Sequence, residues 1–338
     1  MTRSILLTND FPPVISGIST VFYHIWKYYS PERMLVLTPR AKESDAFDRS
    51  ALFRPVRFRS FTGGIIGKLI SFALMAFWCS WYVFFRRVRE IHAGQILSCG
   101  PIGYMYQKLF GIPCFLWVYG GETTDAYRRS WLEERIVGIL LRGCSFLVTN
   151  SPVVTEEFLA YGIPEDRIIE IIPAVDADTF TPGPPPAHLV EKLGLADKQV
   201  ILTVSRLTER KGHDLVLKAL SILRNRDKLH YVIVGTGEDR ERLERIVESH
   251  SLSGRVTFAG RVDDTELPGY YRLCDIYVMP NREVLESTDS IEGFGISFVE
   301  ANACEKPVIA GRSGGTSAAV EDGITGYFVD PENPGELA

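Results

Sequence analysis

The sequence predicts an α/β protein with two domains, each built on a parallel β-sheet whose strands are joined by helices. Short apolar runs alternate with helical segments along the chain, which is typical of a doubly wound sheet. The 338 residues are long for one domain, so two are expected. The densest proline cluster, at 181–186, separates two series of alternating elements. We therefore predict a Rossmann-like N-terminal domain at 1–172 and a Rossmann-like C-terminal domain at 173–338.

Composition describes an ordinary globular chain, with 46% hydrophobic and 23% charged residues. A net charge of −5 gives no reason to expect nucleic acid as a partner. The six cysteines show neither a C-x-x-C pair nor zinc spacing, so we expect buried thiols and no metal site. The N-terminus opens into a strand without the pattern of a signal peptide, which predicts a cytoplasmic protein.

In the first half, apolar runs predict strands, and the loop after the first strand is a candidate ligand loop. That loop contains Asp10, Ser16 and Gly17, and open α/β sheets bind ligands at such loops. Ser19 is expected to cap the helix that follows. The predicted strands are Ser4–Thr8, Met34–Thr38, Ile96–Cys99, Cys114–Val118 and Phe146–Thr149.

The segment Leu69–Phe85 has 17 uncharged residues and is followed by a basic cluster that reaches Arg89. A helix of this length spans about 26 Å, short of the roughly 30 Å hydrocarbon core of a bilayer. Three readings stay open: a helix buried in the domain, an interfacial helix that docks on a membrane, or a true span. Aromatic and basic side chains suit the interfacial reading, in which residues 69–89 contact the membrane peripherally. The continuous domain pattern on both sides disfavours a span.

In the second half, the loops that follow the predicted strands carry glycine or charge. Arg206 and Lys211 follow the first of these strands, and Gly235 and Gly237 follow the second. Val262 ends a Gly-Arg-Val loop after the third. Guanidinium and ammonium groups suit a diphosphate, and glycine lets a backbone approach one closely. The strands are Val200–Val204, Tyr231–Val234, Val256–Phe258, Ile276–Met279 and Pro307–Ala310.

Two glutamates flank a Gly-Phe-Gly turn near the C-terminal end. Glu292 precedes the turn, and Glu300 falls about one turn into the helix expected from Ile296. A helix N-terminus attracts anionic groups, and ionised carboxylates accept hydrogen bonds from sugar hydroxyls. The alternative without a functional role is a strand-to-helix turn with two solvated glutamates. Together with the loops above, the pattern predicts a nucleotide-sugar pocket.

These motifs resemble retaining glycosyltransferases of family 4, which have the GT-B fold of two Rossmann-like domains facing across a cleft. The opening Thr-Asn-Asp-Phe-Pro-Pro, through Gly17-Ile, is similar to the mannosyltransferases that build phosphatidylinositol mannosides. The resemblance implies a metal-independent hexosyltransferase that needs no cofactor. It would transfer a hexose with retention from a nucleoside-diphosphate sugar, with GDP-mannose favoured, to a glycan or lipid-linked acceptor. It would act in the cytoplasm or at the inner face of the membrane.

The resemblance also implies roles for individual residues. Arg206, Lys211 and Glu292 would act in catalysis. Asp10, Ser16, Gly121 and Glu122 would face the acceptor side. The donor would be bound by Gly17, Gly235, Gly237, Val262, Phe294, Gly295 and Glu300.

The chain departs from the family pattern on the acceptor side. Many members have a histidine where Gly121 stands, and His92 is interpreted as structural because it precedes a predicted strand. A different GT-B activity, such as a sugar-nucleotide epimerase, and a catalytically weak nucleotide-sugar-binding protein therefore stay as alternatives. The chain ends where another helix would begin, so we expect the C-terminal helix to be cut short.

Overall fold

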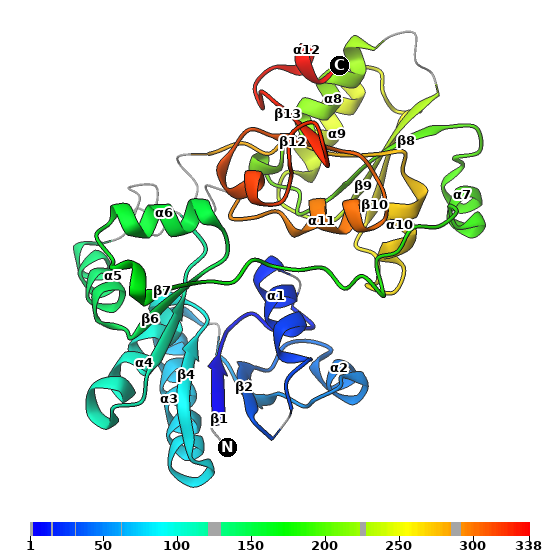
Figure 1. Ribbon diagram of the computed structural model, residues 1–338. Coiled ribbons are helices and arrows are strands. Elements are labelled where there is room, and N and C mark those ends of the chain that lie inside the picture. The colour runs from blue at the N-terminus through cyan, green and yellow to red at the C-terminus, as the bar shows by residue number, and fades with distance from the viewer. Residues whose placement is uncertain are drawn as a thin grey trace. The chain divides into compact units, whose positions relative to one another are not determined.

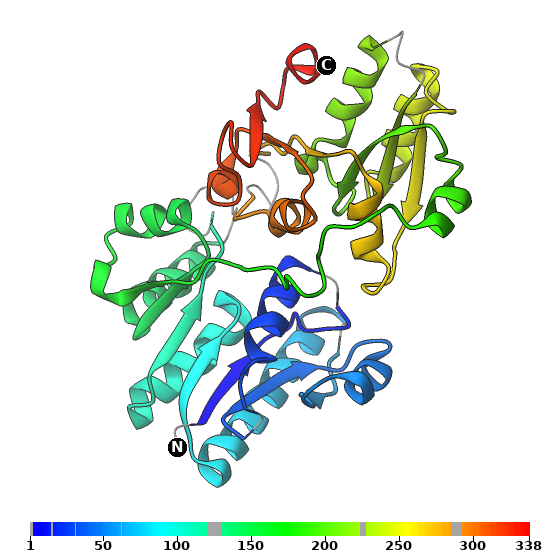
Figure 2. The same cartoon turned by 45° about the vertical axis from the view of Figure 1, so that its right-hand side comes forward.

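A computed structural model describes residues 3–14, 16–30, 32–61, 63–120, 130–223, 228–284 and 292–338. It divides the chain into two compact units, Met1–Pro173 and Ala174–Ala338. Each unit is a parallel sheet covered by helices, so the predicted α/β class is confirmed (Figures 1 and 2).

The first unit has a seven-stranded sheet with the order β3-β2-β1-β4-β5-β6-β7. The chain winds outward in one direction to β3 and then returns to place β4 beside β1. This reversal makes the carboxyl ends of β1 and β4 the switch point, where such sheets bind ligands. The strands are β1 (Arg3–Leu7), β2 (Met34–Pro39), β3 (Val56–Phe58), β4 (Val88–Ala93), β5 (Cys114–Trp117), β6 (Phe146–Thr149) and β7 (Ile168–Glu170).

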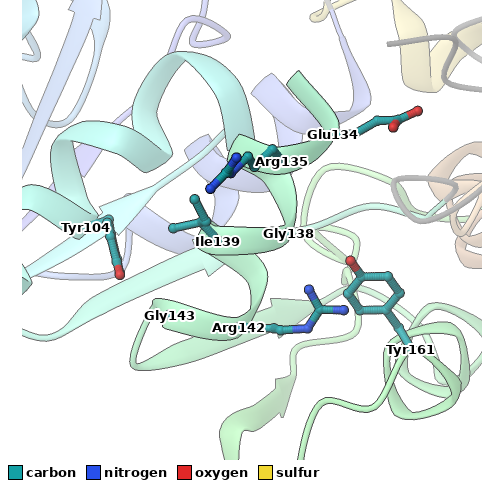
Figure 3. Close-up of a pocket in the computed structure, with 8 residues that line it drawn as sticks. All are labelled: Tyr104, Glu134, Arg135, Gly138, Ile139, Arg142, Gly143 and Tyr161. Atoms are coloured by element: carbon teal, nitrogen blue, oxygen red, sulfur yellow. The ribbon is translucent and has the colours of Figure 1, made fainter. Parts of the chain in front are cut away.

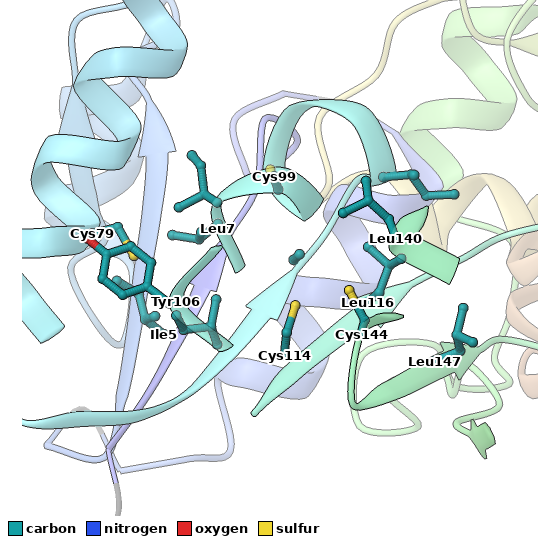
Figure 4. Packing of buried hydrophobic residues seen from close by; sticks show 14 of the residues in the cluster. Ile5, Leu7, Cys79, Cys99, Tyr106, Cys114, Leu116, Leu140, Cys144 and Leu147 are labelled. Atoms are coloured by element: carbon teal, nitrogen blue, oxygen red, sulfur yellow. The ribbon is translucent and has the colours of Figure 1, made fainter. Parts of the chain in front are cut away.

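The helices of the first unit bury two separate apolar clusters. One cluster joins α3, α4 and α5 to the strands and includes Cys79, Cys99, Cys114 and Cys144 (Figure 4). The other is aromatic and centres on Phe22 of α1. All six cysteines of the chain are buried free thiols, as the sequence predicts. The helices are α1 (Gly17–Trp26), α2 (Ser44–Ser50), α3 (Gly64–Arg86), α4 (Ile96–Phe110), α5 (Trp131–Gly143) and α6 (Pro152–Ala160), with a short η1 (Glu165–Arg167).

Two local predictions in the first unit are wrong. Residues Ile96–Cys99 do not form a strand but the first turn of α4, and the strand is Val88–Ala93 instead. A four-residue apolar run fits a strand and a buried helix turn equally well, because periodicity needs a longer window. Ser19 does not cap α1: Ser16 is the N-cap, and its side chain accepts a hydrogen bond from the Ser19 amide at 3.0 Å.

Helix α3 exposes most of its apolar side chains, so a helix wholly buried in the domain is the wrong interpretation. Only 17% of its most apolar 18-residue window is buried. Gly67, Met75, Cys79 and Val83 form the buried stripe. Among the described residues, α3 is the one helix whose length and composition would allow it to cross a membrane.

The second unit has a six-stranded sheet with the order β10-β9-β8-β11-β12-β13, so its switch point lies at β8 and β11. In Figure 1 the short helix α12 lies beside α8. The strands are β8 (Gln199–Val204), β9 (Leu229–Val234), β10 (Val256–Gly260), β11 (Ile276–Met279), β12 (Val308–Gly311) and β13 (Gly326–Val329). The helical segments are α7 (Ala187–Leu193), η2 (Glu209–Lys211), α8 (His213–Ile222), α9 (Arg240–Ser249), α10 (Leu267–Leu273), α11 (Ile296–Ala303), η3 (Gly314–Ala318) and α12 (Pro334–Leu337).

Candidate active site in the second unit

The loops after β8 and β11 meet at the switch point of the second sheet. The Arg282 amide, after β11, donates to the Arg210 carbonyl of η2 at 2.9 Å. Beneath them the Arg282 guanidinium donates to Asp214 Oδ1 at 2.6 Å, and both side chains are buried. Arg282 and Asp214 therefore lock the two loops together at the position where a ligand of an open sheet is expected.

Glu292 lies against two cations of η2. Arg210 Nη1 donates to Glu292 Oε2 at 2.7 Å, and Lys211 Nζ contacts the same oxygen. The three side chains are 7%, 12% and 12% exposed for Arg210, Lys211 and Glu292. The structure therefore brings Lys211 and Glu292 together, although 81 positions separate them in the chain.

The cations keep Glu292 ionised. Burial raises the pKa of the Glu292 carboxyl, but Lys211 and Arg210 outweigh burial and lower that pKa from 4.5 to about 2. A largely buried carboxylate that is ionised at neutral pH accepts strong hydrogen bonds. It can therefore orient sugar hydroxyls or balance a nearby positive charge.

Glu300 has the opposite environment. It lies inside α11, is 7% exposed, and accepts a hydrogen bond from the Tyr271 hydroxyl at 2.6 Å. Burial raises the pKa of Glu300 to about 7, although the Tyr271 hydrogen bond works against that rise. The two glutamates of the motif therefore differ in charge state near neutral pH.

The glycines of the motif loops have packing reasons of their own. A Cβ on Gly235, whose φ is +138°, would lie 1.9 Å from the Ser205 carbonyl oxygen, and a Cβ on Gly237 would lie 2.2 Å from that of Leu207. The loops after β8 and β9 thus pack backbone against backbone, which only glycine permits. Gly295, with φ +88°, is the N-cap of α11, and a Cβ there would lie 2.5 Å from the Phe298 ring.

A buried polar chain lies beneath the loop that carries Arg206. His213, at the start of α8, is 2.9 Å from both Ser205 Oγ and the Tyr231 hydroxyl. The Tyr231 hydroxyl is in turn 2.8 Å from Thr203 Oγ1. Burial lowers the pKa of His213 to about 4, so its ring is neutral and can serve both neighbours. Arg206 itself is exposed on this braced loop.

Two other predicted donor residues, Phe294 and Val262, lie in the second unit, whereas Gly17 lies in the first. Phe294 is 5% exposed, so its side chain belongs to the interior. Val262 is partly buried and packs on the core of the unit. Gly121 and Glu122, predicted for the acceptor side, fall outside the described residues.

The predicted acceptor loop sits at the switch point of the first sheet. The Asn9 amide donates to Gln95 Oε1 at 3.0 Å, which ties the loop after β1 to the loop after β4. The Asp10 amide donates to Thr8 Oγ1 at 3.1 Å. Ser16 caps α1, and Gly17 is its first residue, with open space where a Cβ would lie. The N-terminus of α1 thus opens at this ligand-binding edge.

His92 is a packing residue, as the sequence interpretation has it, but it lies on β4. Its ring stacks on Phe115 at 4.7 Å, and Trp117 Nε1 donates to His92 Nδ1 at 3.3 Å. Burial lowers the pKa of His92 to about 4. A neutral, stacked ring fits structure rather than acid–base work.

A separate hollow of about 450 Å³ lies on the helical face of the first unit (Figure 3). Tyr104 of α4, Arg135 and Arg142 of α5, and Tyr161 line it, with the Arg142 guanidinium 4.8 Å from the centre of the Tyr161 ring. None of the residues predicted from the sequence lines this hollow.

Sequence reasoning missed Arg210 and Tyr271, which contact the two motif glutamates directly. The adjacent cations Arg210 and Lys211 were a usable signal for the first, since cations that become buried in a fold need an anionic partner. Tyr271 gave no signal, because aromatic residues in a helix are ordinarily core residues.

Two parallel-sheet units with a charged edge on the second are typical of sugar-transferring enzymes with the GT-B fold. The family model of the glycosyl transferases group 1 matches residues 188–338. Two relatives that are 31% and 39% identical align with 100% and 96% of the chain, so the chain belongs to this family of glycosyltransferases. The predicted enzyme class and family are therefore confirmed.

Two relatives carry the same name, GDP-mannose-dependent alpha-(1-6)-phosphatidylinositol monomannoside mannosyltransferase. The protein from Mycobacterium tuberculosis is 31% identical over 100% of this chain and 88% of its own length. The protein from Mycolicibacterium smegmatis is 39% identical over 96% of this chain and 85% of its own. The Anabaena protein HepE, solved in complex with UDP and glucose, has a TM-score of 0.82 at 21% identity over 100% of this chain and 88% of its own, which supports the fold alone.

Proposed function

We propose that this protein transfers mannose from GDP-mannose to a lipid-linked acceptor with retention of the anomeric configuration. The observation that carries the proposal is the cluster in which Lys211 and Arg210 share the Glu292 carboxylate at the switch point of the second sheet. The names of the two mycobacterial relatives support GDP-mannose as donor and a phosphatidylinositol glycolipid as acceptor.

In the proposed reaction the bond between the anomeric carbon and the β-phosphate oxygen breaks. An acceptor hydroxyl oxygen then bonds that carbon on the same face, and its proton passes to the departing phosphate. Arg206 and Lys211 stabilise the negative charge that builds on the phosphate. Glu292 orients the sugar hydroxyls, Glu300 binds the ribose hydroxyls, and the backbone at Phe294 and Gly295 approaches the donor.

The remaining assignments belong to the same proposal. Gly17, Gly235, Gly237 and Val262 approach the nucleotide or its phosphates, and Asp10 and Ser16 face the acceptor side. The acceptor-side assignments of Gly121 and Glu122 stay predictions from the sequence. We propose no metal or organic cofactor, because the cations of the β8 loop can meet the leaving-group charge.

A thermal-shift screen with GDP, UDP and ADP tests the donor class. A ligand at 100 times its Kd adds about 2.7 kcal/mol to the free energy of unfolding. We expect GDP to shift the melting temperature more than UDP or ADP. Release of GDP from GDP-mannose only when a phosphatidylinositol mannoside is added would establish transfer. An epimerised sugar nucleotide formed without acceptor, or GDP binding without turnover, would favour the alternatives instead.

We also propose that helix α3 docks on the cytoplasmic face of a membrane. Its outward apolar side chains include Ile66, Leu69 and Phe85, which are 73%, 61% and 68% exposed. Phe84 of α3 meets Phe110 of α4 at 5.3 Å, which extends the apolar surface onto a second helix. Arg86 and Arg87 follow at its C-terminal end, where they can meet anionic headgroups.

Replacing Trp81 and Phe85 by aspartate is expected to abolish co-sedimentation with vesicles that contain anionic phospholipid. The change places two charges on the face that would enter the headgroup region, where apolar burial drives binding. The matched control replaces Ile324 and Tyr327, which are 73% and 64% exposed in the second unit, by aspartate. Wild-type protein that stays in the supernatant, or a control that loses binding equally, would contradict the proposal.

A further inference from the structure

Arg210 and Lys211 meet on one oxygen of Glu292, although a single cation would suffice to pair that carboxylate. Counted over these three side chains, the cluster carries a net charge of +1. Without Arg210, Lys211 and Glu292 would form a neutral pair, and Glu292 would hold Lys211 in place. Because Arg210 also pairs with Glu292, Lys211 is able to leave Glu292 when an anionic ligand binds.

The two cations differ in how firmly they are held. The carbonyl of Arg210 accepts the Arg282 amide at 2.9 Å, and the Arg282 side chain is itself anchored on buried Asp214. The Arg210 guanidinium is planar and pre-organised for a carboxylate, whereas Lys211 carries a compact charge on a flexible stem. Lys211 is thus the cation that can turn from Glu292 toward a phosphate.

Glu292 is also anchored through its backbone. Its carbonyl accepts the Gly315 amide of η3 at 2.6 Å, so the chain at Glu292 is fixed from the β12 side. If Lys211 left and no other cation stayed, a nearly buried carboxylate would lose its partner, at a high cost in free energy. Because Arg210 stays paired with Glu292, Lys211 can leave the carboxylate without that cost.

We infer that Arg210 is a positioning residue, which holds the Glu292 carboxylate in place while Lys211 exchanges its contact with Glu292 for one with the diphosphate of the donor. The inference rests on the proposed function, since the proposed donor supplies that diphosphate. Arg210 itself stays on Glu292 and does not contact the donor. No bond is made or broken in this step; one ion pair replaces another.

A double-mutant cycle of Arg210→Met and Glu292→Gln, read by GDP affinity in calorimetric titration, tests the inference. In the wild-type background we expect Arg210→Met to weaken GDP binding at least tenfold, because Lys211 is then held one to one by Glu292. In the Glu292→Gln background we expect the same change to weaken binding less than threefold. Arg210→Lys, which keeps the charge, should stay within about threefold of wild type.

The same cycle in thermal unfolding gives a readout without nucleotide. Glu292→Gln leaves two adjacent cations, so adding Arg210→Met should raise its melting temperature, although Arg210→Met lowers that of the wild type. The matched control is Arg240→Met, which removes an arginine that pairs with Glu244 and lies over the Phe258 ring at the surface of the second unit. It should leave GDP affinity unchanged and shift the melting temperature equally in both backgrounds.

Two results would overturn the inference. Equal losses of GDP affinity in both backgrounds would make Arg210 a direct diphosphate contact, and additive melting shifts would show that Arg210 does not act through Glu292. Either result leaves the proposed function standing if GDP still binds the wild type. A wild-type protein that binds no GDP would overturn the proposed function together with the inference.

Discussion

Glu292→Gln is expected to lower the rate of sugar transfer about a hundredfold or more while GDP binding survives. The amide keeps the shape of the side chain but loses the charge that Arg210 and Lys211 share. Removing one preorganised electrostatic group from an active site typically reduces kcat by about 10² to 10³. Lys211, no longer paired with Glu292, stays available to the diphosphate. Two quantities check this prediction: kcat for transfer from GDP-mannose and the Kd of GDP, each compared between variant and wild type.

The same substitution should also destabilise the second unit. Arg210 and Lys211 are left as neighbouring, nearly buried cations, and breaking a buried ion pair costs about 3 kcal/mol. All five tryptophans precede residue 174, so scanning calorimetry is the suitable measurement, because tryptophan fluorescence reports the first unit. The control is Glu244→Gln, which breaks the exposed 2.6 Å pair with Arg240 and should cost less than about 1 kcal/mol. Unchanged transfer in Glu292→Gln would contradict the assigned role of Glu292.

Much of the fold follows from local patterns in the sequence. The helix predicted from Ile296 is α11, because Gly295 allows the positive φ that starts it. The strand Val88–Ala93 escaped prediction because Arg89, Glu90 and His92 interrupt its apolar character. Only the parallel neighbours β1 and β5 make that segment a central strand. Tertiary pairing, rather than propensity, decides such a case.

The sequence predicted which types of residue form the candidate site, but not which of these residues contact one another. Glycine and charge after each strand identify the C-terminal edge of the second sheet, since parallel strands end together there. However, 82 positions separate Arg210 from Glu292, and 29 separate Tyr271 from Glu300. No local rule indicates that one glutamate meets two cations and the other a tyrosine. Their opposite pKa shifts therefore emerge only from the folded chain.

GDP affinity is expected to rise about tenfold between pH 6 and pH 8, beyond the change caused by titration of the diphosphate itself. The free protein holds Glu300 with a pKa of about 7, so much of it is protonated at neutral pH. Ribose hydroxyls donate to the ionised carboxylate, and binding therefore expels the proton. Glu300→Gln, titrated with GDP over the same pH range, retains the diphosphate titration and lacks the Glu300 contribution. The difference between the two proteins isolates Glu300.

The stability of the free protein also tests the raised pKa of Glu300. It should fall as pH rises, whereas GDP affinity should increase. The folded-state pKa of Glu300 lies above the ordinary 4.5, so the folded chain binds the proton more tightly than the unfolded chain. The resulting stabilisation is lost as pH rises from about 4.5 to about 7. From pH 5 to pH 8 the free energy of unfolding of Glu300→Gln should therefore gain about 2 to 3 kcal/mol relative to wild type. A constant difference would mean that Glu300 is already ionised in the free protein, and nucleotide binding would then release no proton from it.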